Sequence, residues 1–193
     1  MAQKLATAFD GALVTATVSR LLVDLNRSIG HPRLFSATTR RLSPAMREDI
    51  LAQYYRPYRE QVEALVRQAV SEGKRVIHIS SHSFTPELNG TVRRADIGLL
   101  YHPARDGEAR LCAQWQASLA AMAPALRVRR NYPYAGKGDG LTAHLRLHFA
   151  AASYIGIELE VNQHIVQAEA ATWLALGALL PDSLRAACAV AVP

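Results

Sequence analysis

The feature that most constrains the fold is an alternation of strand-like and helix-like segments along the chain. Val76 to Ser80 alternates as a buried strand does, and Ala12 to Val18 is also rich in strand-forming residues. Tyr154 to Val161 and the shorter Leu126 to Arg130 have the same character. Strands that alternate with helices favour a layered α/β fold, in which reactive residues are expected on loops at strand ends.

Helical patterns fill the segments between these strands. Ser43 and Pro44 form an N-cap and first-turn pair, and the helical pattern that begins there continues to about Val70. Pro57 should kink or divide this helix, because proline lacks the amide proton that an interior position donates. Further helices are expected over Glu108 to Ala121, Leu141 to Ala152 and His164 to Leu180.

Length and composition indicate one compact globular domain. The chain has 193 residues, of which 50% are hydrophobic and 20% charged, so a substantial core can form. No uninterrupted apolar run approaches the roughly eighteen residues of a membrane span, and Met1 to Asp10 lacks the pattern of a signal peptide. We therefore expect a soluble, cytoplasmic protein without a membrane partner. Cys112 and Cys188 are expected to be buried thiols.

The charge balance is basic, with a net charge of +6 and a pI near 9.7, which would suit a protein that binds nucleic acid. The arginines are scattered, however, and do not form one basic stripe with interleaved aromatic residues. Arginine also grips carboxylates with two parallel hydrogen bonds. We therefore expect a small anionic ligand and no nucleic acid, with most arginines on a solvated surface.

The most informative segment is Ser80-Ser81-His82-Ser83-Phe84, which we expect to leave the strand and enter a polar loop broken by Pro86. An imidazole at such a place can bind a metal, although a lone histidine after a strand is more often a hydrogen-bonded structural residue. Four other segments accompany it in a fixed order. They are Asp24-Leu25-Asn26-Arg27, Val92 to Tyr101, Gly138 to Thr142, and Gly156 to Asn162.

This ordered set resembles the N-formylglutamate amidohydrolase family and, more distantly, the zinc carboxypeptidases, over nearly the whole chain. The resemblance implies a three-layer helix/sheet/helix fold with a mixed, mostly parallel sheet, similar to that of zinc-dependent exopeptidases. It also implies a single amidohydrolase-like domain over residues 1–193, a zinc cofactor, and as substrate a small anionic N-acylated amino acid such as N-formylglutamate.

The resemblance assigns roles by position. In carboxypeptidases an Asn-Arg pair binds the substrate carboxylate, and a His-Ser-aromatic segment supplies the last zinc ligand. Asn26 with Arg27 and His82 match these positions, and Arg93 and Arg94 are further candidates for the carboxylate. We expect His82 and Arg27 to face one cleft. Taken singly, Arg27 is equally compatible with a surface ion pair and His82 with a structural loop residue.

The general base is expected on a late strand, where the resemblance places a glutamate that activates water. Glu158 and Glu160 are two residues apart, so both should project from the face opposite Ile157, Leu159 and Val161. Relatives tend to carry glutamine at the position matching Glu158 and an acidic residue at the position matching Glu160. We therefore favour Glu160 as the base, the alternative being that both glutamates form ion pairs.

The chain departs from the family pattern in its metal ligands. Such enzymes carry their first two ligands on a loop upstream of the Asn-Arg pair, but here the first histidine, His31, follows Arg27 and no His-x-x-Glu occurs. Catalytic zinc needs three protein ligands, so we expect weak, substoichiometric zinc binding. The residues from Ala2 to Ala8 look like the end of a helix, from which we infer an N-terminal truncation that removes a strand and the metal-binding loop.

Two alternatives stay open. One is a metal-free relative that keeps the fold and binds an anionic ligand or partner without catalysis. The other concerns His144 and His148, which lie one helical turn apart at a workable spacing for a metal. This pair lacks the glutamate and the third histidine of helical zinc motifs, so a solvent-exposed pair is the simpler interpretation.

Overall fold

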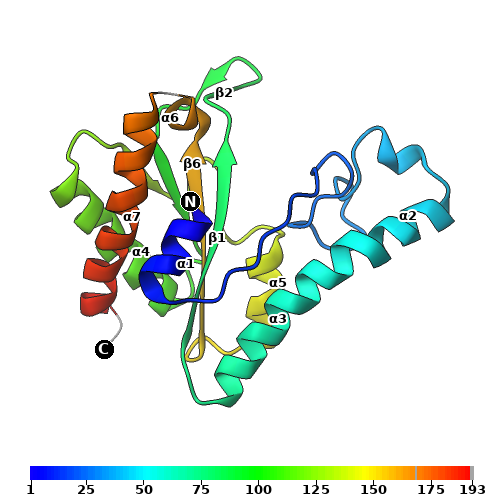
Figure 1. Ribbon diagram of the computed structural model, residues 1–193, viewed down its shortest axis with the longest axis horizontal. Coiled ribbons are helices and arrows are strands. Elements are labelled where there is room, and N and C mark those ends of the chain that lie inside the picture. The colour runs from blue at the N-terminus through cyan, green and yellow to red at the C-terminus, as the bar shows by residue number, and fades with distance from the viewer. Residues whose placement is uncertain (168, 192–193) are drawn as a thin grey trace. The chain divides into compact units, whose positions relative to one another are not determined.

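The computed structural model describes residues 1–167 and 169–191, which form two compact units (Figure 1). The sheet unit contains residues 1–11, 77–138 and the chain from 155 onward, and the helical unit contains residues 12–76 and 139–154. The sheet unit has one hydrophobic core, and the helical unit has two. The single amidohydrolase-like domain, lacking an N-terminal strand and metal-binding loop, stays a prediction.

The sheet unit is built on a mixed four-stranded sheet. Across the sheet, the strands are β1 (Val76–Phe84), β6 (Tyr154–Asn162), β4 (Ile97–Leu100) and β5 (Val128–Arg130). Strand β4 pairs in parallel with β5 and antiparallel with β6, and Figure 1 shows β1 and β6 running in the same direction. The α/β class with a mixed, mostly parallel sheet and flanking helices is thereby confirmed. A small hairpin, β2 (Glu87–Leu88) with β3 (Thr91–Val92), connects β1 to β4.

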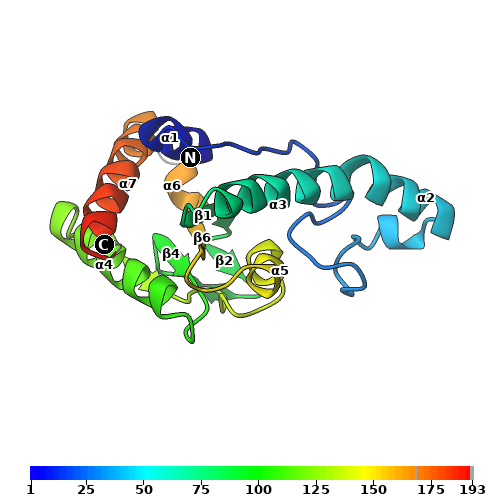
Figure 2. The ribbon, with the colours of Figure 1, turned by 90° about the horizontal axis from the view of Figure 1, so that it is seen from below.

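One face of this sheet is covered by helices α1 (Ala2–Phe9), α4 (Asp106–Met122) and α7 (Ala170–Ala191). Figures 1 and 2 show α4 and α7 side by side along this face. Alternate residues of β4 and β6 pack against Trp115 and Leu180 of these helices. The indole Nε1 of Trp115 donates a 2.9 Å hydrogen bond to Ser183 Oγ, so the buried polar atom of this ring is satisfied.

Helix α7 is long and apolar enough to cross a membrane by length and composition. Of its most apolar window, 44% is buried inside the fold, and Leu176, Leu180 and Leu184 belong to the core of the sheet unit. Core helices of soluble proteins meet the same criterion, so this property is weak evidence for a membrane span.

The helical unit begins with the turn η1 (Thr39–Arg41) and a long helical segment. This segment consists of α2 (Pro44–Ile50), a π-helical turn η2 (Leu51–Tyr55) and α3 (Arg56–Ser71). Ser43 Oγ accepts a 3.2 Å hydrogen bond from Met46 N, which confirms the predicted N-cap. Pro57 lies just after the π turn. The helix is therefore divided next to this proline, as expected for a residue that lacks an amide proton.

Helix α5 (Leu141–His148) packs against α3 in one of the two cores of the helical unit. Val62 and Val66 of α3 meet Leu141 and Leu145 of α5 there. Tyr154 and Val76, the first residues of β6 and β1, complete this cluster. A second cluster joins Val23 and Leu34 of the preceding loop to Leu51 and Tyr55 of the long helix.

Several predicted elements differ from the structure. The strand expected over Ala12 to Val18 is wrong: this segment is irregular, and no strand of the described chain pairs with it. Its Val14 and Val18 pack singly onto the two cores of the helical unit, so its β-branched residues are used without a ladder. Strand β4, a short run that we did not predict, is fully buried.

Two predicted helices also have different bounds. The helix expected up to Ala152 ends at His148, because Phe149 turns to an extended conformation and packs into the core with Tyr154. The helix expected from His164 divides into α6 (Gln163–Val166) and α7. Asn162 Oδ1 accepts a hydrogen bond from the N–H of His164 and so caps α6.

Candidate active site

The two candidate glutamates lie on the sheet face that α1, α4 and α7 leave uncovered. Ile157, Leu159 and Val161 of β6 point into the core of the sheet unit, so Glu158 and Glu160 project from the opposite face, as the alternation predicts. Glu160 is only 5% exposed, whereas Glu158 is half-buried. A buried carboxylate beside a half-buried one gives this face two groups of unequal environment, which suits acid/base chemistry.

Strand β1 brings His82 to the same face. Ile77 and Ile79 pack against the core, so His78, Ser80 and His82 project from the face that carries the two glutamates of the neighbouring strand. The strand continues to Phe84, and His82 therefore lies within it and not on the loop that we expected. Its Nε2 lies 2.9 Å from Ser80 Oγ, which fixes the orientation of the ring.

A close contact of the backbone brings a loop over this face next to Glu160. Gly98 of β4 is the register partner of Glu160, and a Cβ atom at Gly98 would lie 2.0 Å from the carbonyl oxygen of Tyr132 and 3.3 Å from Glu160 Cβ. Only glycine leaves room for this carbonyl. The Tyr132 carbonyl therefore lies over β4, directly beside the buried glutamate.

Asn131 fixes the loop from 131 to 136. Its Oδ1 accepts hydrogen bonds from the N–H groups of Tyr101, at 3.0 Å, and of Gly136, at 3.1 Å. A Cβ atom at Gly136 would lie 2.1 Å from Tyr101 N, so the loop also packs backbone against backbone at this end. The turn-forming residues of this loop predict a turn, but nothing in the sequence predicts where the loop packs on the sheet.

The two arginines expected to bind a carboxylate precede β4. Arg93 donates a 3.0 Å hydrogen bond from Nη1 to Tyr134 Oη, and its guanidinium lies 5.1 Å from the centroid of that ring. Arg94 is exposed. Arg93 thus contacts the same loop that covers Gly98, whereas Arg94 faces solvent.

Asp96 is a buried carboxylate in an ionic network that the sequence did not reveal. Its carboxylate accepts two hydrogen bonds from the Arg127 guanidinium, at 2.9 and 3.1 Å, and lies 3.1 Å from His164 Nε2. Burial acts to raise the pKa of Asp96, but the hydrogen bonds from Arg127 outweigh it, so the pKa is lowered and the carboxylate stays charged. This network holds the start of β4 and thereby Gly98 in place.

Asn26 and Arg27 lie in the helical unit. Asn26 Oδ1 accepts a 2.7 Å hydrogen bond from the N–H of Leu141, and Arg27 Nη1 donates a 2.9 Å hydrogen bond to the carbonyl of Asp139. Ser28 donates to the carboxylate of Asp139 through both its N–H and its hydroxyl group. Burial would raise the pKa of Asp139, but the bonds from Ser28 outweigh it and the pKa is lowered. Two of the segments singled out in the sequence thus meet here.

The turn that carries Arg27 is held from the long helix. Tyr55 Oη donates a 2.7 Å hydrogen bond to the carbonyl of Arg27, and burial raises the pKa of this phenol, which keeps it a donor. The Arg27 side chain is 24% exposed. Because Arg27 lies in the helical unit and His82 in the sheet unit, the expectation that both face one cleft stays a prediction.

Comparison with known proteins decides the family. The N-formylglutamate amidohydrolase family matches residues 1–166, most of the chain. The chain belongs to the N-formylglutamate amidohydrolase family. The crystal structure of a gene product from Agrobacterium tumefaciens is similar, with 26% identity and a TM-score of 0.82 over 97% of this chain and 75% of that one. A search of curated proteins found no match.

The resemblance to the N-formylglutamate amidohydrolase family implies a zinc ion, and catalytic zinc needs three protein ligands. Within residues 1–167 and 169–191, no group of three or more His, Cys, Asp or Glu side chains is placed to hold a metal ion. Cys112 is a buried thiol and Cys188 a half-buried one, and burial raises the pKa of Cys188. The described residues therefore do not fit a zinc site with three protein ligands.

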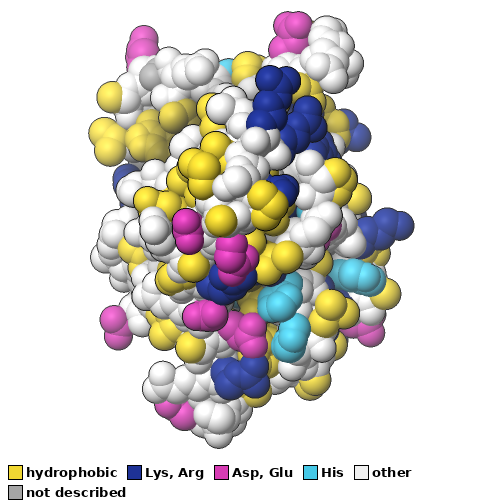
Figure 3. All heavy atoms as spheres, turned by 90° about the vertical axis from the view of Figure 1, so that its right-hand side faces the viewer, with side chains coloured by type: hydrophobic (Ala, Val, Ile, Leu, Met, Phe, Trp, Pro, Cys, Tyr) yellow, Lys and Arg dark blue, Asp and Glu magenta, His cyan; other side chains and the backbone are white. Residues whose placement is uncertain are grey.

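The helical histidine pair has partners within the protein. The rings of His144 and His148 have centroids 4.4 Å apart, and His148 Nδ1 lies 2.9 Å from the carbonyl oxygen of His144. His144 Nε2 lies 3.2 Å from Glu63 Oε2, and Arg67 binds the same carboxylate. Figure 3 shows histidine side chains next to acidic and basic ones on this face. The pair is a component of a surface ionic cluster that joins α3 to α5.

This cluster makes the stability of the helical unit sensitive to acid. Burial would raise the pKa of Glu63, but hydrogen bonds from His144 and Arg67 outweigh it, so the pKa lies below its ordinary value of 4.5. A carboxylate with a lowered pKa stabilises the folded state fully above pH 4.5, and this stabilisation is lost as pH falls through the folded-state pKa. We expect Glu63→Gln to lower the free energy of unfolding by about 0.5 to 1 kcal/mol at neutral pH and to flatten this acid dependence.

Urea unfolding followed by far-UV circular dichroism, at neutral and acidic pH, measures both effects. Glu60→Gln, an exposed change on the same helix, is the matched control and should leave the pH dependence as in the unaltered protein. An acid dependence that is equally steep in the Glu63→Gln protein would show that this cluster does not contribute to it.

Proposed function

We propose that this chain hydrolyses the amide bond of a small N-acylated acidic amino acid, N-formylglutamate or a close analogue. Membership of the N-formylglutamate amidohydrolase family supports an amide-hydrolysing activity. The observation that carries the proposal is a buried and a half-buried glutamate on one sheet face. The neighbouring strand carries His82 on that face, and the loop that contains Tyr132 lies against Gly98, next to Glu160. Such unequal carboxylates are what proton transfer at a carbonyl needs.

In the proposed reaction, Glu160 acts as the general base. It takes a proton from water while the water oxygen attacks the amide carbonyl, and the C–N bond then breaks as the proton passes to the leaving amine. The products are formate or another carboxylic acid and the free amino acid. Glu158, more exposed on the same face, adjusts the charge around Glu160.

The substrate carboxylate is assigned to the arginines. Asn26 and Arg27 are the first pair, and Arg93 and Arg94 are further candidates. The Asp139 carbonyl takes one donor of the Arg27 guanidinium, and this group carries several more in a planar fork that matches a carboxylate. Fixing the substrate by its carboxylate would hold the amide in one orientation, which lowers the entropy lost in the reaction.

Zinc has a limited place in this proposal. The resemblance implies zinc in complete family members, where it would polarise the amide and lower the pKa of bound water. In this chain His82 is the one proposed ligand, and the described side chains do not supply the others, so none of the steps above is assigned to a metal. We expect weak zinc binding, below one ion per chain after dialysis. We further propose a cytoplasmic protein that acts on a small molecule.

The shortage of metal ligands in the described part of the chain supports a second function. A metal-free relative could keep the fold and bind an anionic ligand without catalysis. The lack of a three-ligand group among the described residues favours this alternative.

Formate release from N-formyl-L-glutamate, measured with and without added zinc, separates the two functions. The matched control substrate is N-formyl-L-norleucine, which lacks the side-chain carboxylate, and kcat/KM for it should be at least about tenfold lower. Calorimetric binding of N-formylglutamate without formate release would support the metal-free relative. If the chain neither binds N-formylglutamate nor releases formate from it, both functions are refuted. Metal analysis of the dialysed protein tests the zinc expectation independently, and one bound ion per chain would contradict it.

A further inference from the structure

A pocket of about 330 Å³ lies in the loop region of the helical unit, between residues 20 and 40. Four arginines line it, together with one carboxylate and an aromatic ring. They are Arg20, Arg27, Arg33, Arg40, Asp24 and Phe35. Arg20, Arg33 and Arg40 have no part in the proposed hydrolysis. The arginines are scattered in the sequence, so their position around one pocket was not predicted.

The walls of the pocket are held by the fold. Val23 and Leu34 are buried in one core cluster with Leu51 and Tyr55 of the long helix. The N–H of Asp24 donates a 2.8 Å hydrogen bond to the carbonyl of Leu34, which ties the two sides of the loop together. Because the loop is anchored at this point, its arginines are presented from a fixed backbone and an anion would meet a largely preformed site.

The charges in the pocket are not balanced within the protein. Asp24 Oδ2 accepts a 2.8 Å hydrogen bond from Arg20 Nη2, and Asp24 Oδ1 accepts from the N–H of Asn26. The guanidinium of Arg27 lies further away, with Nε 3.9 Å from Asp24 Oδ2. Among the residues that the structure describes, neither Arg33 nor Arg40 forms an ion pair. The single carboxylate is thus largely satisfied by Arg20, and a clear excess of positive charge remains.

Arginines that line one pocket in excess of carboxylates attract an anion, and their planar guanidinium groups favour ligands with carboxylate or phosphate oxygens. One monovalent ion would leave most of this charge unbalanced, so a ligand with at least two anionic groups fits better. The volume is at the lower end of the range for small-molecule pockets, which points to a small organic ligand and not a macromolecule.

We propose that this pocket binds a small polyanion that carries two or more carboxylate or phosphate groups, and that Arg33 and Arg40 are binding residues for it. Arg27 lines this pocket and is also assigned to the substrate carboxylate, whereas Arg33 and Arg40 have no part in the proposed hydrolysis. The proposal therefore concerns these two residues, and ligand binding to them is measured without turnover. Arginine stays charged at all accessible pH values, so affinity should follow the ionisation of the ligand and weaken as salt screens the charges.

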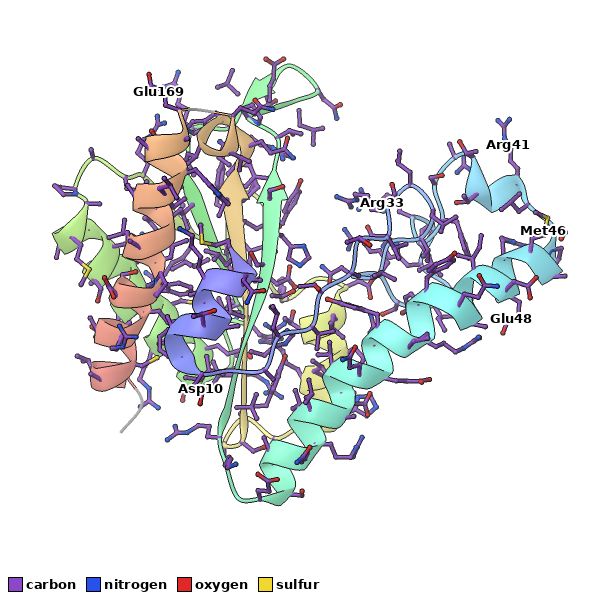
Figure 4. The ribbon with its side chains drawn as sticks, viewed as in Figure 1. Asp10, Arg33, Arg41, Met46, Glu48 and Glu169 are labelled. Carbon is purple, nitrogen blue, oxygen red and sulfur yellow. The ribbon has the colours of Figure 1, made fainter. Side chains whose placement is uncertain are left out.

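Isothermal titration of the purified chain with pyrophosphate and with citrate, at equal low ionic strength, tests the proposal. We expect saturable binding of at least one of them at one site per chain. Arg33→Gln and Arg40→Gln should each weaken it about tenfold, the effect of losing one charge-assisted contact. The matched control is Arg41→Gln, which removes another exposed arginine that does not line the pocket and should change affinity less than about twofold. Figure 4 shows Arg33 and Arg41 in different parts of this loop region.

Tighter binding of pyrophosphate would assign the ligand to phosphates, and tighter binding of citrate would assign it to polycarboxylates. No binding of either, or equal losses in the Arg41→Gln and Arg40→Gln proteins, would overturn the site. Phenylglyoxal labelling of the unaltered chain, read by mass spectrometry, is a check that needs no variant. The bound anion should protect Arg33 and Arg40 but not Arg41, and equal labelling with and without the anion would also overturn the proposal.

Discussion

Replacing Glu160 by glutamine is expected to lower kcat for the hydrolysis of N-formylglutamate about a hundredfold or more, the effect of losing a general base. Glutamine has the shape of glutamate but cannot accept the proton of water. Glu160 is 5% exposed, and a Cβ atom at the neighbouring Gly98 would lie 3.3 Å from Glu160 Cβ, so the side chain is packed on the sheet face. The measurement is steady-state formate release, together with thermal unfolding to show that the fold is kept.

Glu158→Gln is the matched comparison, because it makes the same change two residues away on the same face. We expect a much smaller loss of kcat, since Glu158 is more exposed and is assigned only an electrostatic part. If Glu158→Gln causes the large loss and Glu160→Gln does not, the two roles are reversed. If neither lowers kcat, the mechanism with a glutamate base is wrong for this protein.

Those parts of the fold that rest on local pattern could be predicted from the sequence. The alternation in Val76 to Ser80 and Tyr154 to Val161 identifies two real strands, and Ser43 caps a helix as its position before Pro44 predicts. Ala12 to Val18 has strand-like composition but lies outside the sheet. Composition alone does not decide whether a neighbouring strand is available, because pairing is a long-range property.

The candidate site shows the same division. The common face of Glu158 and Glu160 follows from the two-residue period of a strand, and the structure confirms it. We expected His82 on the loop after the strand, and this was wrong: His82 lies within β1, because nothing in the local sequence ends the strand before Phe84. The contact of Gly98 with Tyr132 could not be foreseen, since it joins residues far apart in the chain through two backbones. The pairing of Asp96 with Arg127 and His164 has the same origin.

Replacing Gly98 by alanine is expected to lower the free energy of unfolding of the sheet unit by about 2 kcal/mol or more, because the added methyl group has no space. A Cβ atom there would lie 2.0 Å from the carbonyl oxygen and 3.1 Å from the carbonyl carbon of Tyr132. Both are backbone atoms, so no side chain can rotate away, and the loop fixed by Asn131 must move as a whole. Such a movement also changes the surroundings of Glu160, whose Cβ atom lies next to Gly98, so any amidohydrolase activity should fall with the stability.

Gly107→Ala tests whether this effect belongs to the site and not to glycine replacement in general. Gly107 lies in the first turn of α4, and a Cβ atom there would lie 3.4 Å from Ile155 Cδ1, the end of a flexible side chain. Alanine favours a helix more than glycine does, so stability should be unchanged or rise by less than about 1 kcal/mol. Urea unfolding followed by the fluorescence of Trp115 and Trp173, both in the sheet unit, measures the two variants in the same way. Equal stabilities of the Gly98→Ala and Gly107→Ala proteins would mean that the loop over β4 yields easily, and the placement of the Tyr132 carbonyl beside Glu160 would lose its importance for the site.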